Sequence, residues 1–380
     1  MDVASDSCSG IFIAGRSLGV KMDQHSDEPK RPSIAIAGGY PHHLVLKVQE
    51  AFERNQWQTY FFDTSPKSPV DIVFIKPFNK LVHGLRIKRH SNFFQQGMFS
   101  NLGWRSYRWL RMIQKLRPDA ALVVRGNNFA DPWLRRAAAI CPHYCWFVEP
   151  HSRLEGVIQE ARSGIYRKVF AYANNYVVEM RARGIDAEFF PHGVARIPLE
   201  GRIRNQQRQY DWCFIGGHSP WREECIRAVT EKIPNGYLVG PRWKRAARRH
   251  KVFRKVLKGE YHGMEQAYEV YLNSRIGLDV FSRKELGKDG ITMRFVELLA
   301  CGCLVVTQPA MELECLPWHS VSRVSYFNSP AELTDACLGI LNRQPTPEEI
   351  ELACRLTEGI SGYDGLVKRI ESSRNYERLS

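Results

Sequence analysis

The chain has 380 residues, of which 44% are hydrophobic and 11% aromatic, and its 54 Lys and Arg against 40 Asp and Glu give a formal net charge of +14. This length and apolar content suffice for two domains with cores of their own, while no run approaches the roughly 20 apolar residues that a membrane-spanning helix needs. The charge favours anionic partners, namely phosphorylated small molecules, acidic membrane surfaces or nucleic acid.

Residues 1–30 mix acids, serines and glycines around one short apolar patch. They lack the basic start and long apolar core of a signal peptide, so we expect a poorly ordered tail. The ten cysteines are scattered through a large chain, which indicates reduced thiols rather than a disulfide scaffold. These features predict a cytoplasmic protein, either free or peripheral at the inner membrane face.

Short apolar strands alternate with amphipathic helices along the first half of the chain. Gly38 and Gly39 follow the first strand, and the next residues place apolar side chains on one helical face. Strands are predicted at 33–37, 59–63, 71–75, 119–126 and 143–150. The alternation indicates an α/β domain over residues 31–195, with a parallel sheet covered by helices on both faces.

A second series of strands and helices begins near Tyr210, after the polar and basic segment 196–209, which we interpret as a linker. Strands are predicted at 210–217, 236–240, 274–281 and 303–307. They indicate a second doubly wound domain over residues 210–345, with ligands expected beyond the carboxyl ends of its strands. A capping box at Thr346 then opens C-terminal helices over 346–380, which could cross back to the first domain.

An arginine stands at an unusual place in the segment 290–306, which predicts a helix followed by a buried strand. Thr292 caps the expected helix, and Arg294 then lies in its first turn, where the positive end of the helix dipole disfavours a cation by about 0.3–1 kcal/mol. Helix amides together with an arginine form a strong anion site. The alternative is a surface ion pair between Arg294 and Glu297, one turn on, worth a few tenths of a kcal/mol.

The segment 277–308 resembles the donor-binding segment of GT-B-fold glycosyltransferases of the glycosyl transferase group 1 type, in particular the spore-maturation-protein-like branch. In that superfamily an acidic residue, seven intervening residues and a glutamate precede Ala-x-Gly and an apolar strand. Asp289 and Glu297 stand at this spacing here. The family's first acid is usually glutamate, so Asp289 departs from the pattern.

The resemblance implies a GT-B fold, an α/β architecture in which two Rossmann-like, doubly wound domains face each other across a cleft. It assigns Glu297 to the donor's ribose and Arg294 to its diphosphate. It also implies that Asp289 and the loop around Gly290 and Thr292 meet the sugar.

Residues 210–223 resemble the first strand of the donor domain, which ends in a glycine turn followed by an arginine. The resemblance implies that Gly216, Gly217 and Arg222 line the diphosphate from the other side, where a glycine turn admits a phosphate and an arginine stabilises the departing group. Gly240 ends a neighbouring strand and is assigned to the substrate. For Arg222 alone, the alternative is an exposed helix arginine.

The N-terminal half resembles the same branch more loosely. Related enzymes often carry a histidine at the strand end that corresponds to His151 and Glu149, where it faces the transferred sugar. Either residue is therefore a candidate catalytic group, against the alternative of a loop histidine without a ligand. Gly38 and Gly39 could give close backbone approach to the donor phosphates or the acceptor.

Several common signatures are absent from the sequence. There is no Asp-x-Asp triplet of the kind that holds a metal and a diphosphate, no Walker phosphate loop, and no dinucleotide fingerprint with a later acid. Cys141 and Cys145 flank His143, but a structural zinc site needs four ligands and no companion pair exists. His192 is interpreted as structural. We therefore expect no metal, and no cofactor besides a nucleotide-sugar substrate.

Residues 241–258 hold nine Lys or Arg and no acid. Trp243, Phe253 and Val256 could form the apolar face of a helix whose cations contact an anionic membrane surface or a phosphorylated lipid. The alternative is a solvated basic helix packed on the sheet. Nucleic acid is a third partner, but no recognition motif accompanies the charge, so we do not expect it.

These interpretations together predict a metal-independent, retaining, hexosyltransferase-like enzyme that moves a sugar from a nucleotide-diphosphate sugar to an acceptor. The acceptor is open: a glycan, a lipid carrier, a protein or a small molecule. An inverting outcome, with His151 or Glu149 as base, is also open. A non-catalytic nucleotide-sugar-binding or regulatory protein of the same fold, and a basic nucleic-acid-associated protein, remain the alternatives.

Overall fold

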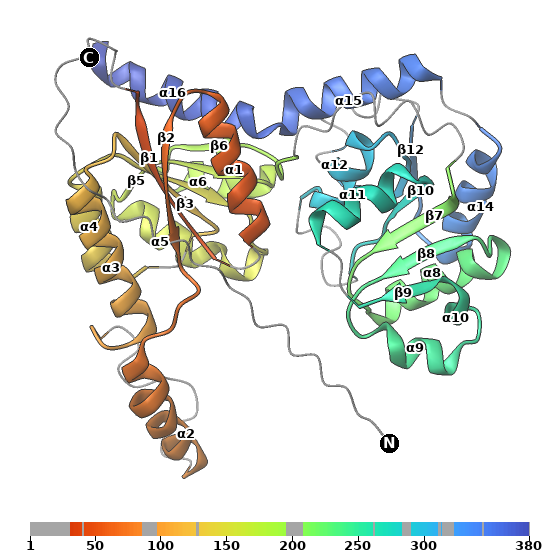
Figure 1. The fold of residues 1–380 in the computed structure, drawn as a ribbon, viewed down its shortest axis with the longest axis horizontal. Coiled ribbons are helices and arrows are strands. Elements are labelled where there is room, and N and C mark those ends of the chain that lie inside the picture. The colour runs from red at the N-terminus through yellow and green to blue at the C-terminus, as the bar shows by residue number, and fades with distance from the viewer. Residues whose placement is uncertain are drawn as a thin grey trace, which may run out of the picture. The chain divides into compact units, whose positions relative to one another are not determined.

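Two parallel β-sheets of six strands each carry the fold (Figure 1). The structure, a computed structural model, describes residues 31–39, 42–85, 97–126, 129–194, 208–260, 263–282, 290–310, 313, 323–343 and 346–379. The predicted tail 1–30, most of the predicted linker, and Asp289 lie outside the described residues. Residues 32–380 belong to one compact unit.

The first sheet has the strand order β2-β1-β3-β4-β5-β6. Its strands are β1 (Ser33–Gly38), β2 (Gln58–Asp63), β3 (Ala120–Val124), β4 (His143–Phe147), β5 (Tyr166–Ala171) and β6 (Ala187–Phe189). All side chains of β1, β3 and β4 are buried, which is the pattern of parallel strands covered on both faces.

Helices cover both faces of this sheet. Successive side chains of a strand point to opposite faces, so strands whose side chains are all buried need cover on both sides. The helices of one face are α3 (Asn101–Leu116), α4 (Asp131–Ala138), α5 (Leu154–Arg162) and α6 (Asn174–Ala182). Those of the other are α1 (His42–Arg54) and the C-terminal α16 (Tyr363–Leu379). Ala35 and Val123 face the first group, whereas Ile36 and Leu122 face the second.

Residues 71–75, predicted as a strand, are helical instead. They form η1 (Asp71–Ile75), which continues directly into α2 (Lys76–Gly84). The buried side chains Asp71, Ile75, Asn79 and Val82 recur every three to four residues, so the run has the helical period and only one face against the protein. A five-residue apolar run is too short to reveal this period by itself.

The second sheet has the strand order β12-β11-β10-β7-β8-β9. Its strands are β7 (Tyr210–Ile215), β8 (Gly236–Val239), β9 (Leu257–Gly259), β10 (Ser274–Asp279), β11 (Leu304–Thr307) and β12 (Val324–Tyr326). One face packs on α8 (Pro220–Lys232), α9 (Trp243–Arg249), α10 (Phe253–Val256) and α14 (Pro330–Leu341). The other packs on α11 (Met264–Leu272) and α12 (Met293–Ala300).

The chain returns to the first sheet through its last two helices, which are blue in Figure 1. α15 (Pro347–Ser361) opens with the capping box formed by Thr346 and Glu349 and contacts α12. α16 follows after Gly362 and packs on α1. At the junction the amide of Val194 donates to the carbonyl of Ser361 at 2.8 Å. One continuous pair of helices therefore contacts elements of both sheets.

The described cysteines are free and buried. His143 lies in the first core, where its Nε2 accepts from the indole of Trp109 at 3.2 Å and its Nδ1 lies 2.8 Å from the carbonyl of Cys141. Among the described residues no three His, Cys, Asp or Glu side chains group in a way that could hold a metal ion. No helix in the described part of the chain has both the length and the hydropathy to cross a membrane.

Candidate functional site

A cavity of about 270 Å³ lies where α12 begins, and it is lined by side chains from both halves of the chain. Four of the predicted substrate residues line it together: Arg222, Gly290, Thr292 and Arg294. Tyr172 and His192 line it from the N-terminal half. The backbone fit is close, because a Cβ atom on Gly290 would lie 2.7 Å from the carbonyl oxygen of Tyr172.

Arg294 is held by contacts with three residues on two strands, β7 and β10. Its Nε donates to the carbonyl of Ile215 at 2.7 Å, and its Nη1 donates to Asp279 at 3.0 Å. The guanidinium also lies 4.6 Å from the ring centroid of Phe214, within cation–π range. The expected surface ion pair with Glu297 is not formed, since the side chain of Arg294 is only 13% exposed and pairs with Asp279.

Asp279 ends β10 and is fully buried. Besides Arg294, it accepts hydrogen bonds from the hydroxyls of Thr292 at 2.7 Å and Thr307 at 3.1 Å. Burial raises its pKa, and Arg294 and the two hydroxyls oppose that shift. Thr292 also caps α12 by accepting from the amide of Phe295. Asp279 therefore ties the start of α12 and Arg294 to the carboxyl edge of the second sheet.

The first turn of α8 carries the second arginine. The Nε of Arg222 donates to the carbonyl of Val280 at 2.8 Å, and its Nη1 donates to that of Gly217 at 3.1 Å. Its guanidinium lies 5.6 Å from the ring of Phe214, the ring that Arg294 also contacts. Two guanidinium groups therefore flank one aromatic ring at the edge of the cavity, and the N-terminal amides of α12 add partial positive charge.

The predicted glycines pack closely at the ends of β7 and β8. A Cβ on Gly216 would lie 2.7 Å from Nη2 of Arg294, and one on Gly240 would lie 1.9 Å from the carbonyl oxygen of Gly216. That carbonyl accepts from the indole of Trp243 at 2.8 Å. A Cβ on Gly217 would meet only the Pro241 ring, at 3.6 Å, an ordinary contact distance. Gly216 thus makes room for the Arg294 side chain, and Gly240 makes room for Gly216.

His192 lines the cavity from the N-terminal half, although the sequence led us to interpret it as structural. Its ring centroid lies 4.4 Å from that of Tyr172. Its Nδ1 is buried and has no hydrogen-bond partner among the described residues. Burial lowers its pKa to about 4, assisted by the charge of Arg125. The imidazole is therefore neutral at physiological pH and offers a polar atom to a ligand.

Glu297 lies one turn beyond Arg294 and is 7% exposed. Burial raises the pKa of its carboxyl to about 7, against the charge of Arg294 and a hydrogen bond with Tyr271. It is not among the side chains that line the cavity.

Glu149 and His151 are not among the residues that line the cavity, although their neighbours Val148 and Pro150 are. The Glu149 carboxylate pairs with Arg125 at 3.2 Å and with Arg153 at 3.5 Å. The imidazole of His151 is half exposed and lies 3.7 Å from Glu179.

Gly38 and Gly39 also lie apart from the cavity lining. A Cβ on Gly38 would lie 2.3 Å from Val45 of α1, and one on Gly39 would lie 2.6 Å from the hydroxyl of Thr64. Close packing of β1 on its neighbours explains both glycines without a ligand.

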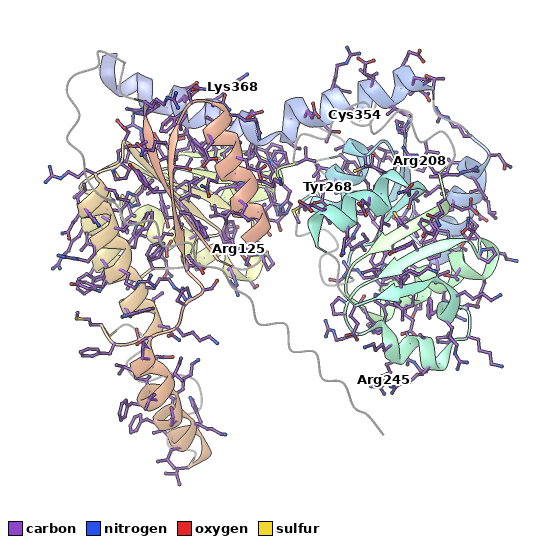
Figure 2. All side chains as sticks on the ribbon, in the orientation of Figure 1. Arg125, Arg208, Arg245, Tyr268, Cys354 and Lys368 are labelled. Atoms are coloured by element: carbon purple, nitrogen blue, oxygen red, sulfur yellow. The ribbon has the colours of Figure 1, made fainter. Side chains whose placement is uncertain are left out.

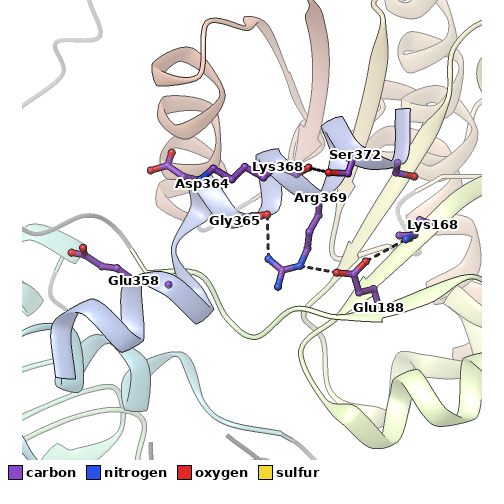
Figure 3. Close-up of a pocket in the computed structure, with 10 residues that line it drawn as sticks. Lys168, Glu188, Glu358, Asp364, Gly365, Lys368, Arg369 and Ser372 are labelled. Atoms are coloured by element: carbon purple, nitrogen blue, oxygen red, sulfur yellow. Dashed lines mark hydrogen bonds and ion pairs between the residues drawn. The ribbon is translucent and has the colours of Figure 1, made fainter. Parts of the chain in front are cut away.

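A larger cavity of about 530 Å³ lies beside α16 (Figure 3). Its charges compensate one another: Glu188 pairs with Lys168 at 3.2 Å and with Arg369 at 2.7 Å. The remaining lysine, Lys368, lines the cavity together with two further carboxylates. This cavity lacks the excess of positive charge found at the start of α12.

The basic segment 241–258 folds into α9, α10 and β9 rather than one helix. Trp243, Phe253 and Val256 are buried in the second core, so the expected apolar face is not exposed. The cations point to solvent, and Arg245 lies on the outer side of α9 (Figure 2). The segment is therefore a basic surface packed on the sheet, without an apolar face for a membrane.

The comparisons with known proteins agree with this architecture. Residues 222–355 match the family model described as glycosyl transferase-like. No curated protein sequence matches the chain significantly. The chain resembles sucrose-phosphate synthase from Thermosynechococcus elongatus with a TM-score of 0.59 at 12% identity, over 92% of this chain and 99% of that one.

Two further solved structures are similar over almost their whole length. A UDP-forming α,α-trehalose-phosphate synthase from Burkholderia xenovorans gives a TM-score of 0.57 at 11% identity, over 91% of this chain and 99% of that one. UDP-GlcNAc 2-epimerase from Neisseria meningitidis, bound to UDP-GlcNAc, gives 0.53 at 12% identity, over 90% and 99%. At such identities the likeness establishes the fold alone. The chain therefore has the GT-B fold, with a glycosyl transferase-like segment over residues 222–355.

Proposed function

We propose that this protein transfers a glycosyl group from a nucleoside-diphosphate sugar to an acceptor hydroxyl. The observation that carries the proposal is the convergence of Arg222, Arg294 and the start of α12 on one cavity. Two guanidinium groups and helix amides are the groups that stabilise a diphosphate. The glycosyl transferase-like segment supports transfer over other reactions of the same fold.

The proposed reaction breaks the bond between the anomeric carbon and the diphosphate oxygen, which leaves with the bonding electrons. Arg222 and Arg294 stabilise the negative charge that develops on this oxygen. The acceptor oxygen forms the new bond on the same face, and its proton passes to the departing phosphate. Retention is part of the proposal, because the new bond forms on the face from which the diphosphate departs. Independence from metal ions is also part of it, because the two arginines supply the positive charge that a metal cation would otherwise supply.

His192 faces the transferred sugar in this proposal, in place of His151 and Glu149. Its neutral imidazole and partnerless Nδ1 can exchange a hydrogen bond with a sugar hydroxyl. Tyr172, packed against it, gives the sugar an aromatic wall. Glu297 remains assigned to the ribose through the sequence resemblance, and reaching it requires a ligand to approach behind Arg294.

Calorimetry of the full-length protein with UDP, GDP and ADP sugars tests the binding step. Arg222→Gln and Arg294→Gln should each weaken binding at least about tenfold, since each removes a charged hydrogen-bond donor. Arg245→Gln is the matched control, because that arginine is exposed on α9 and lies outside the cavity. Unchanged affinity in both cavity variants would remove the basis of the proposal.

Product analysis tests the reaction itself. Incubation with the donor that binds should release free nucleoside diphosphate, and the chelator EDTA should not reduce the rate. The anomeric configuration of the product, read by NMR, tests retention. Isomerised donor without transfer would indicate an epimerase, and binding without any turnover would indicate a non-catalytic nucleotide-sugar-binding protein.

A further inference from the structure

Exposed apolar side chains gather in one part of the described chain. Of the fifteen large hydrophobic residues that are exposed there, nine lie between Val70 and Phe99. They belong to η1, α2, the residues that flank them, and the turn before α3. Scattered exposed hydrophobic residues are ordinary, but a contiguous group marks an interaction surface. In Figure 1, α2 extends from the end of the first sheet's helices instead of lying on the sheet.

The helix presents an apolar stripe to solvent. Phe74, Phe78, Leu81 and Leu85 are 68%, 45%, 60% and 62% exposed. Their spacing of four, three and four residues puts them on one side of a helix. The side that contacts the protein is a different one, made by the buried residues from Asp71 to Val82. The stripe is therefore left open by the packing of η1 and α2.

A cationic stripe runs along the opposite flank. Lys76 and Lys80 lie one turn apart and, together with the His83 imidazole, line a cavity of about 450 Å³ against the start of α3. Arg105 lines the cavity as well, and Asp71 is the one carboxylate of its described lining. Asp71 is already engaged, since its carboxylate accepts from the side-chain amide of Asn101 at 2.6 Å and lies 3.8 Å from Nζ of Lys76. The cavity thus has an excess of positive charge and suits a phosphate group.

We propose that η1, α2 and the turn at 97–99 dock on a membrane surface that contains anionic lipids. The apolar stripe enters the acyl boundary, and the cations meet the lipid phosphates. Charge complementarity favours this occupant over a second copy of the chain, because a copy would bring another +14 molecule against Lys76 and Lys80. The proposal does not depend on glycosyl transfer.

The docking surface differs from the basic segment 241–258. That segment offers cations, but Trp243, Phe253 and Val256 are buried in the core. Of these two regions, as far as the structure describes them, the α2 region alone combines exposed apolar side chains with cations. The two surfaces can therefore be separated by mutation.

Co-sedimentation of the full-length protein with vesicles tests the proposal. We expect binding to vesicles of phosphatidylcholine with phosphatidylglycerol, and at least about tenfold weaker binding to phosphatidylcholine alone. Phe74→Ser with Leu81→Ser should weaken binding at least about tenfold, as should Lys76→Gln with Lys80→Gln. All four side chains are exposed, so the variants should fold, and circular dichroism checks this.

Two controls keep the result specific. Leu338→Ser removes an apolar side chain of α14 that is 43% exposed and lies outside the docking surface. Arg245→Gln with Lys255→Gln removes cations from α9 and α10. Both variants should bind as wild type. Absence of vesicle binding, or full binding by the Phe74/Leu81 variant, would overturn the proposal. So would a loss confined to the Arg245/Lys255 variant. A wild-type dimer in sedimentation equilibrium that the Phe74/Leu81 substitutions dissociate would identify a copy-to-copy interface instead.

Discussion

Replacing Glu297 with glutamine should remove a pH-dependent destabilisation of the folded protein. The carboxyl is buried on α12, and burial raises its pKa from 4.5 to about 7 despite Arg294 and Tyr271. An acid with a higher pKa in the folded state binds more protons there than in the unfolded state. Folding stability therefore decreases as pH rises through the window between 4.5 and about 7. Glutamine carries no charge and lacks this decrease.

The size of the effect follows from the pKa shift. Each pKa unit corresponds to about 1.4 kcal/mol, so the full penalty is about 3 kcal/mol and is reached near pH 8. His143 works in the opposite direction: burial lowers its pKa to about 4, so it removes stability as pH falls through the window from 6.5 to about 4. The contribution of His143 is the same in both proteins. It therefore cancels in the difference between their free energies of unfolding, which is the quantity to measure.

Urea unfolding followed by tryptophan fluorescence, from about pH 5 to about pH 8, gives that difference. Relative to wild type, Glu297→Gln should gain about 2–3 kcal/mol across this range. Glu265→Gln on α11 is the control, since it removes an exposed carboxyl from another helix on the same face of the second sheet. A Glu297→Gln difference that stays constant with pH would refute the reasoning, because it would mean that the carboxyl titrates alike in both states.

Four further substitutions test how the arginine is supported. Asp279→Asn leaves Arg294 without its counter-ion and should lower the free energy of unfolding by about 3–5 kcal/mol, whereas Thr307→Val removes one hydrogen bond and should cost about 1 kcal/mol; equal losses in urea unfolding would contradict the buried pair. Gly216→Ala places a Cβ 2.7 Å from Nη2 of Arg294, so calorimetry should show nucleotide-sugar affinity reduced about tenfold. The same Cβ lies 2.9 Å from the buried ring of Phe214, so the unfolding midpoint should fall as well. Gly240→Ala meets backbone instead and should destabilise by about 2–4 kcal/mol; a fully stable variant would show that the turn relaxes.

The strands of both sheets could be predicted because their signals are local. The expected strands at 274–281 and 303–307 correspond to β10 and β11. The three-residue edge strands β9 and β12 have no pattern long enough to detect. The error at 71–75 has a related cause: an apolar run was read as a buried strand, whereas its side chains are exposed on a helix.

The site could be predicted only in part, because its partners are distant in sequence. The sequence suggests Glu297 as the partner of Arg294, because helical spacing identifies only those side-chain pairs that lie three or four residues apart. The actual partner, Asp279, lies 15 residues upstream at the end of another strand. An acid inside the apolar run 274–281 was the available signal. The sequence signal for His192 was weaker, because nothing in a His-Gly pair distinguishes a residue that lines a cavity from a structural one.

The support around Arg294 explains why a first-turn arginine is tolerated and what it gains. Ile215, Asp279 and Phe214 fix three sides of the guanidinium before any ligand arrives. An arginine side chain loses up to about 2 kcal/mol of rotamer entropy when it is immobilised. Here that loss accompanies folding, so it does not reduce the affinity for an anion. Asp279 is fully buried and outside the cavity lining, whereas Arg294 lines the cavity, so the pair with Asp279 leaves the guanidinium accessible to the diphosphate of the proposed donor.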